Sequence, residues 1–230
     1  MEFIIIAIIA IILSILLGYL FDYNKNKIKH IADDKELDEL ASKYPSNIEI
    51  CKKYLKKLKN QNVKIEENTE SETSLYIAIT NKISIANIAN SYTRIQTIAH
   101  ECLHSIQDRK ILNFNFIFSN LYILYFFTIC ILAIFKMLPN KMLFLSIYLL
   151  QGMVYYMVRI YLENDAMIKA RYLAKEYMEE EKISTPEEIN KIVQGFDKIN
   201  TLGIKCVNYQ FFLNIIIKLF IFSLICIIRK

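Results

Sequence analysis

Long apolar blocks constrain the fold of this chain more than any other feature of its sequence. The first block, residues 3–21, holds no charged residue. A helix of about 20 apolar residues crosses a bilayer. The sequence therefore predicts an α-helical multi-pass membrane protein with about four spans. Their predicted positions are residues 3–21, 114–138, 142–162 and 211–228. Lys218 interrupts the last block, and the sequence leaves open whether that block crosses the whole bilayer.

The charges around the first block predict its orientation. Lys25, Lys27 and Lys29 follow it, whereas only Met1 and Glu2 precede it. Basic residues stay on the cytoplasmic side, so the N-terminus is expected outside and residues 22–112 inside. The short link at 136–141 returns the chain to the same side. The prediction is a multi-pass protein of the cell membrane with cytoplasmic parts at 22–112 and 163–209.

Charge and cysteine content restrict the partners. The formal net charge of the 230 residues is only +5, and the lysines flank apolar blocks or sit among acids. We therefore expect contact with the lipid bilayer and no binding of nucleic acid.

The five cysteines are odd in number and form no CxxC pair, which favours a reducing compartment over a disulfide framework. Any metal must then be held by histidine and carboxylate.

Residues 22–112 have the patterns of a small α+β domain. Residues 33–44 and 47–60 predict two helices, and the second is amphipathic and rich in lysine. That second helix is interpreted either as a solvated helix of the domain or as one lying on anionic lipid.

The pattern then changes to strands and back to a helix. Alternation from Val63 and strand-forming residues at 75–80 and 82–88 predict three short strands, the last two as a hairpin. Helical spacing resumes at Ser91 and continues to Lys110. We expect a small antiparallel sheet packed on that last helix.

One motif in this last helix carries chemistry. His100-Glu101-Cys102-Leu103-His104 has the form HExxH. Residues i and i+4 lie on one helix face, so the two imidazoles can bind one Zn²⁺ ion. Glu101 stands beside them and can accept a proton from a zinc-bound water, whose pKa the metal lowers toward about 7. Cys102 points away from both histidines, so we expect it to pack in the core.

The third metal ligand must come from elsewhere, because a catalytic zinc normally has three protein ligands and one open position. The segment that leaves the third span lies on the same predicted side as His104. We predict Glu163 as the ligand and Asp165 as the acceptor of a histidine N–H. Arg171 is a candidate for stabilising the oxyanion, and His30 is interpreted as a solvated residue.

These residues resemble the YugP-like neutral zinc metallopeptidases of bacterial membranes. The resemblance covers nearly the whole chain, including Gln107 after the motif and the Glu163-Asn164-Asp165-Ala166 segment with Ala170. It implies a gluzincin-like peptidase domain, with Zn²⁺ at His100, His104 and Glu163 and with Glu101 catalytic. Leu103 departs from the pattern, because the family usually has a glycine at that position.

The predicted function is a membrane-bound zinc metallopeptidase that hydrolyses peptide bonds near the cytoplasmic membrane surface. Its polypeptide substrate would pair with the exposed sheet edge within residues 75–88. One alternative is a non-catalytic, zinc-stabilised membrane scaffold or chaperone-like factor, which would not need Glu101. The other is an intramembrane site-2-type protease, but Arg94 and Asp108 make burial of the motif helix in lipid costly. Cleavage specificity and oligomeric state have no signal in the sequence.

Overall fold

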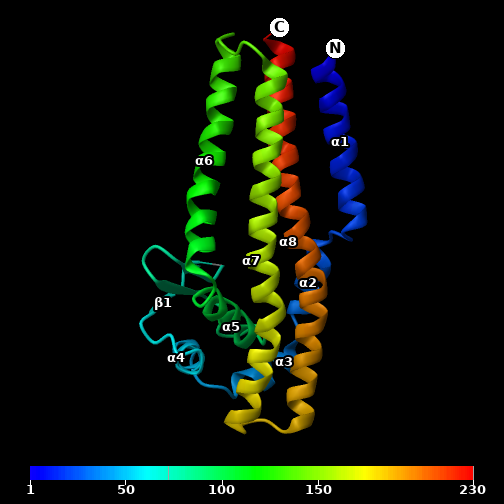
Figure 1. The fold of residues 1–230 in the computed structure, drawn as a ribbon. Helices are drawn as coiled ribbons and strands as arrows, with labels where there is room; N and C mark the ends of the chain where they lie inside the picture. Colours follow the sequence, from blue (N-terminus) through cyan, green and yellow to red (C-terminus); the bar gives the residue numbers. More distant parts are fainter. Residues whose placement is uncertain (72, 230) are drawn as a thin grey trace. The chain divides into compact units, whose positions relative to one another are not determined.

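The computed structural model describes residues 1–71 and 73–229, and Figure 1 gives the arrangement of the chain. Its elements, in chain order, are α1 (Glu2–Leu20), α2 (Lys25–Ala32), α3 (Lys35–Ser42), α4 (Asn47–Lys57), β1 (Lys64–Asn68), β2 (Leu75–Ile77), β3 (Lys82–Ala86), α5 (Arg94–His104), α6 (Arg109–Ile134), α7 (Lys141–Glu181) and α8 (Pro186–Ile228).

The chain folds as two compact units, which we call the helical unit and the mixed unit. The helical unit comprises residues 1–23, 114–161 and 205–230, and the mixed unit comprises residues 24–113 and 162–204. The long helices α7 and α8 contribute to both units.

The helical unit contains the apolar blocks. Four helices, namely α1, α6, α7 and α8, are long and apolar enough to cross a membrane. The four predicted spans therefore form helices. α7 runs on to Glu181, and Thr185 and Glu188 cap α8 reciprocally. The residues after Pro186 and the last span form a single helix, because no proline interrupts the chain after that residue.

Aromatic side chains make much of the interior of the helical unit. The rings of Tyr122 and Tyr148 stack, and their hydroxyls lie 2.5 Å apart. Lys218 Nζ lies 4.9 Å from the centroid of the Tyr122 ring, so a cation–π contact accommodates this lysine. Gln210 and Asn214 precede Lys218 at four-residue spacing on the same helix face, and both of these residues are exposed.

In the mixed unit, α4 packs against the hydrophobic core. Ser46 and Glu49 form a capping box at its start. Tyr54 and Leu55 are buried in the core of the unit. Part of the lysine-rich face also packs against the unit, because Lys53 forms an ion pair with Glu181 of α7.

The sheet has the order β1-β3-β2, and it is mixed rather than antiparallel. β2 and β3 form the predicted hairpin, but β1 pairs with β3 in parallel, so the prediction for β1 was wrong. The physical reason is the direction of β2. It follows β1 in the chain and runs antiparallel to β3 at the opposite edge of the sheet, so it returns the chain to the end from which β3 starts parallel to β1. β3 is central, and its Ile83 and Ile85 are fully buried.

The motif helix is shorter than predicted. α5 ends at His104 rather than at Lys110, and a new helix begins at Arg109. Asp108 causes the break, because its carboxylate accepts a hydrogen bond from the Lys110 backbone N–H at 2.7 Å and so caps α6. On the buried side of α5, Cys102 lies in the core with its Sγ 3.6 Å from Cys51 Sγ, as its position predicted.

Candidate metal centre

Three side chains of the mixed unit come together as a possible metal site. The ligand atoms of His100, His104 and Glu163 all lie within 4.8 Å of one another. The two histidine Nε2 atoms are 3.0 Å apart, and each lies 3.5 Å from Glu163 Oε2. The structure therefore brings together the three residues that the sequence predicted as ligands.

Helix geometry explains how each ligand is presented. His100 and His104 are one turn apart on α5, and their rings meet edge to face with centroids 4.5 Å apart. On α7, Ala166 and Ala170 follow Glu163 at helical spacing and are fully buried in the core of the mixed unit. The face of α7 that carries Glu163 is thus the face turned into this unit.

Gln107 holds the site together from just beyond α5. Its Oε1 is 2.8 Å from His104 Nδ1, and because a carbonyl oxygen only accepts, Nδ1 must carry the proton. In the neutral form of His104, Nε2 then has its lone pair available to a metal. The amide of Gln107 also donates to the Leu162 carbonyl at 2.7 Å, one residue before Glu163.

Asp165 does not have the role that the sequence predicted for it, which was to accept a histidine N–H. Its Oδ1 forms an ion pair with Lys169 Nζ at 2.6 Å, and its Oδ2 lies 3.4 Å from Gln107 Nε2. The N–H of His104 goes to Gln107 instead of to this carboxylate. Asp165 therefore reaches the histidine only through Gln107, because an amide can donate on one side while it accepts on the other.

Glu101 is buried with its carboxylate close to the three possible ligands. Burial raises its pKa, and the nearby histidines and a hydrogen bond from the Tyr76 backbone N–H partly oppose that rise. The side chain is only 6% exposed. A carboxylate with a raised pKa is better matched to taking up a proton near neutral pH than an exposed one.

The charges within this group of side chains favour a protonated His104 and an ionised Glu163. Burial alone would raise the pKa of Glu163, but hydrogen bonds from His100 and His104 lower it well below its usual range. Burial would lower the pKa of His104, but the Glu163 carboxylate raises it overall. Both shifts have one cause, which is a carboxylate that faces two ring nitrogens in a buried place.

Two other residues considered from the sequence lie apart from this group. Arg171 Nε pairs with Asp197 Oδ1 at 2.6 Å, so its guanidinium is engaged by α8 rather than turned to the metal ligands. His30 is exposed on α2. Sequence reasoning assigned no role to Gln107 or to the Tyr76 backbone. The Gln107 contact could have been suspected from its three-residue distance to His104, whereas the Tyr76 contact depends on how the sheet packs.

Comparison of the chain with known protein families, with curated proteins and with solved structures found no match.

Proposed function

We propose that this chain is a membrane-bound zinc metallopeptidase that hydrolyses peptide bonds of polypeptide substrates. The observation that carries the proposal is the spacing of three ligand atoms. Nitrogen and oxygen ligands lie about 2.0–2.1 Å from a tetrahedral zinc ion, which puts them roughly 3.3 Å from one another. The three separations among His100, His104 and Glu163 are 3.0, 3.5 and 3.5 Å.

The donor set also fits zinc in kind. Two imidazoles and one carboxylate are the ligands of a catalytic zinc, and they leave a fourth position for water. Bound zinc would lower the pKa of that water toward about 7. Glu101 would accept a proton from the attacking water and pass it to the leaving amine. Gln107 would keep His104 in the tautomer that binds metal.

The sheet edge next to Glu101 supports a polypeptide as substrate. β2 is an edge strand of the sheet, and the Tyr76 N–H in β2 donates to the Glu101 carboxylate. A substrate segment in extended conformation could lie along this edge, close to the catalytic carboxylate, and bind by backbone pairing. The gluzincin-like character of the mixed unit is part of this proposal.

The proposed location is the cytoplasmic surface of the cell membrane. Four apolar helices support a membrane protein, and Glu163 follows directly on the apolar part of α7. Lys25, Lys27 and Lys29 after α1 support a cytoplasmic mixed unit by the positive-inside rule.

The two alternatives, an intramembrane protease and a zinc-stabilised scaffold, require different features of the chain. An intramembrane protease would need its motif in a spanning helix, but α5 has 11 residues and is too short to cross a bilayer. A zinc-stabilised scaffold would need the three ligands alone. The buried carboxylate of Glu101 beside those ligands favours the enzyme, because burying an acid costs stability and a scaffold does not need this side chain.

Purified full-length protein tests the proposal directly. We expect about one zinc ion per chain, as a three-ligand catalytic site requires. We also expect cleavage in an unbiased peptide library, loss of that cleavage with a chelator and its return with added zinc. Bound zinc without any cleavage would favour the scaffold, and cleavage without metal would rule out this site as its source.

A further inference from the structure

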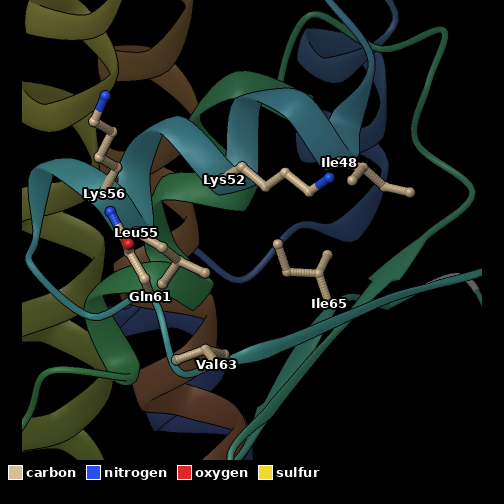
Figure 2. Close-up of a pocket in the computed structure, with 7 residues that line it drawn as sticks. All are labelled: Ile48, Lys52, Leu55, Lys56, Gln61, Val63 and Ile65. Atoms are coloured by element: carbon tan, nitrogen blue, oxygen red, sulfur yellow. The ribbon is translucent and has the colours of Figure 1, made fainter.

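A groove lies between α4 and β1, and β1 is the edge of the sheet opposite to β2. It has a volume of about 600 Å³. Figure 2 shows that Leu55 projects from the helix toward Val63 at the start of the strand, and that Lys52 extends above Ile65. The floor is thus apolar, and an ammonium group lies over it.

The strand that borders the groove has an open edge. β1 is at one end of the β1-β3-β2 sheet and pairs only with β3. The Lys64 N–H donates toward β3, to the Asn81 carbonyl at 3.0 Å. Because the ladder alternates, the backbone groups of Ile65 and Glu67 point away from the sheet. Such an edge is a ready template for one more strand.

The lysines of α4 divide into two sets. Lys53 pairs with Glu181, and Lys57 pairs with Glu176 and Glu180. Lys52 and Lys56 line the groove instead and are exposed, and they form no ion pair with the residues that the structure describes. The groove side of α4 therefore offers two ammonium groups to a partner.

Taken together, the geometry points to a docking site for an extended peptide segment that adds a strand to the open edge of β1. The segment would place an apolar side chain over Val63 and Ile65 and a carboxylate near Lys52 and Lys56. The open edge distinguishes this occupant from an anionic lipid, because an acyl chain could cover the apolar floor but could not pair with the backbone of Ile65.

This site is distinct from the substrate edge of the proposed function. β1 and β2 are the two opposite edges of the same sheet, with β3 between them. A polypeptide could dock on β1 without entering the metal centre. The groove would then select substrates or partners that carry an acidic, apolar, extended segment, and it would do so whether or not the metal centre is catalytic.

Binding of synthetic peptides to the full-length protein in detergent tests the site. The first peptide matches the five residues of β1 in length, with Glu and Val on one face and Thr on the other. The second has Lys in place of Glu, and the third is the first peptide with N-methyl groups along its backbone. A short-chain anionic phospholipid is the fourth probe. All measurements use Glu101→Gln protein, so that no probe is cleaved.

We expect only the first peptide to bind. The double variant Lys52→Glu/Lys56→Glu should weaken its binding by about tenfold, since two exposed ion pairs would be reversed. The matched control, Lys198→Glu/Lys205→Glu, makes the same change in charge at two exposed lysines of α8 and should leave binding unaltered. Absence of binding by the first peptide overturns the site, as does equal binding by the N-methylated peptide. Binding of the phospholipid alone, with the same dependence on Lys52 and Lys56, would assign the groove to lipid instead.

Discussion

His104 Nδ1 donates a hydrogen bond to Gln107 Oε1 across 2.8 Å. The same glutamine donates to the carbonyl of Leu162, the residue before Glu163. One amide therefore connects the end of α5 to the segment of α7 that carries Glu163. It orients one histidine and links the two helices that bear the proposed ligands.

We predict that Gln107→Leu weakens zinc binding by about 10–100-fold, which is the usual effect of removing a partner that orients a metal ligand. Gln107→Glu should lose less, because a carboxylate can still accept from His104 Nδ1 although it cannot donate to Leu162. Competition with a zinc-binding dye measures the affinities. Equal zinc affinity in Gln107→Leu and the parent protein would show that this amide does not position the histidine.

The ligand assignment has its own test. His100→Ala and His104→Ala should each abolish stoichiometric zinc binding, and Glu163→Ala should remove most of it. Asp165→Ala should keep zinc, because this carboxylate contacts Gln107 and Lys169 rather than a histidine. Elemental analysis of the four purified variants decides the matter. Zinc retained by Glu163→Ala but lost from Asp165→Ala would reverse the two roles.

Labelling of single cysteines in intact cells tests the topology. A cysteine in place of the exposed Glu67 should be protected from an impermeant thiol reagent, because the positive-inside rule puts the mixed unit in the cytoplasm. A cysteine in place of Met137, which is 68% exposed in the link between α6 and α7, should react. The reverse pattern would place the proposed active site outside the cell.

Two glycines of α8 give a matched test of packing in the mixed unit. A Cβ atom at Gly195 would lie 2.7 Å from Leu37 Cδ1 and 2.9 Å from Tyr92 Cε2, in the core. Gly195→Ala should therefore reduce stability by about 1–3 kcal/mol. At Gly203 the new Cβ would meet only the terminal methyl of Met167, so Gly203→Ala should be neutral or mildly stabilising. Thermal unfolding in one detergent compares them, and equal unfolding temperatures would contradict the packing described here.

Features that depend on local sequence were predictable. The four apolar helices follow from hydropathy alone, and the capping pair of Thr185 and Glu188 follows from its spacing. The grouping of His100, His104 and Glu163 was predictable for a related reason. HExxH fixes two of them on one helix, and the short link between the second and third apolar blocks pointed to the segment that contains Glu163.

Features that depend on tertiary pairing were not predictable in the same way. Nothing in the residues of β1 distinguishes a parallel from an antiparallel neighbour, because the direction depends on how residues 69–81 return to the sheet. The end of α5 was missed although Asp108 before an apolar run is a capping signal. The predicted role of Asp165 was wrong because Gln107, three residues after His104, takes the N–H of His104 in the folded protein.

The change Glu101→Gln tests the central claim, because it separates proton transfer from metal binding. The amide keeps the shape of the side chain but cannot accept a proton from water. We predict a protein that is expressed, enters the membrane and binds zinc like the parent. Proton transfer by a positioned side chain contributes about 10²–10⁴-fold to rate, so peptide cleavage should be at least about a hundredfold slower.

The most direct measurement is therefore the rate of peptide cleavage per bound zinc ion, taken on the parent protein and on Glu101→Gln. Glu187→Gln, which changes an exposed carboxylate of α8 in the same way, is the matched control and should cleave like the parent. A low rate in Glu101→Gln alone, with zinc content unchanged in all three proteins, is the result that the peptidase proposal predicts. A Glu101→Gln protein that holds zinc and cleaves peptides at the parental rate would contradict it.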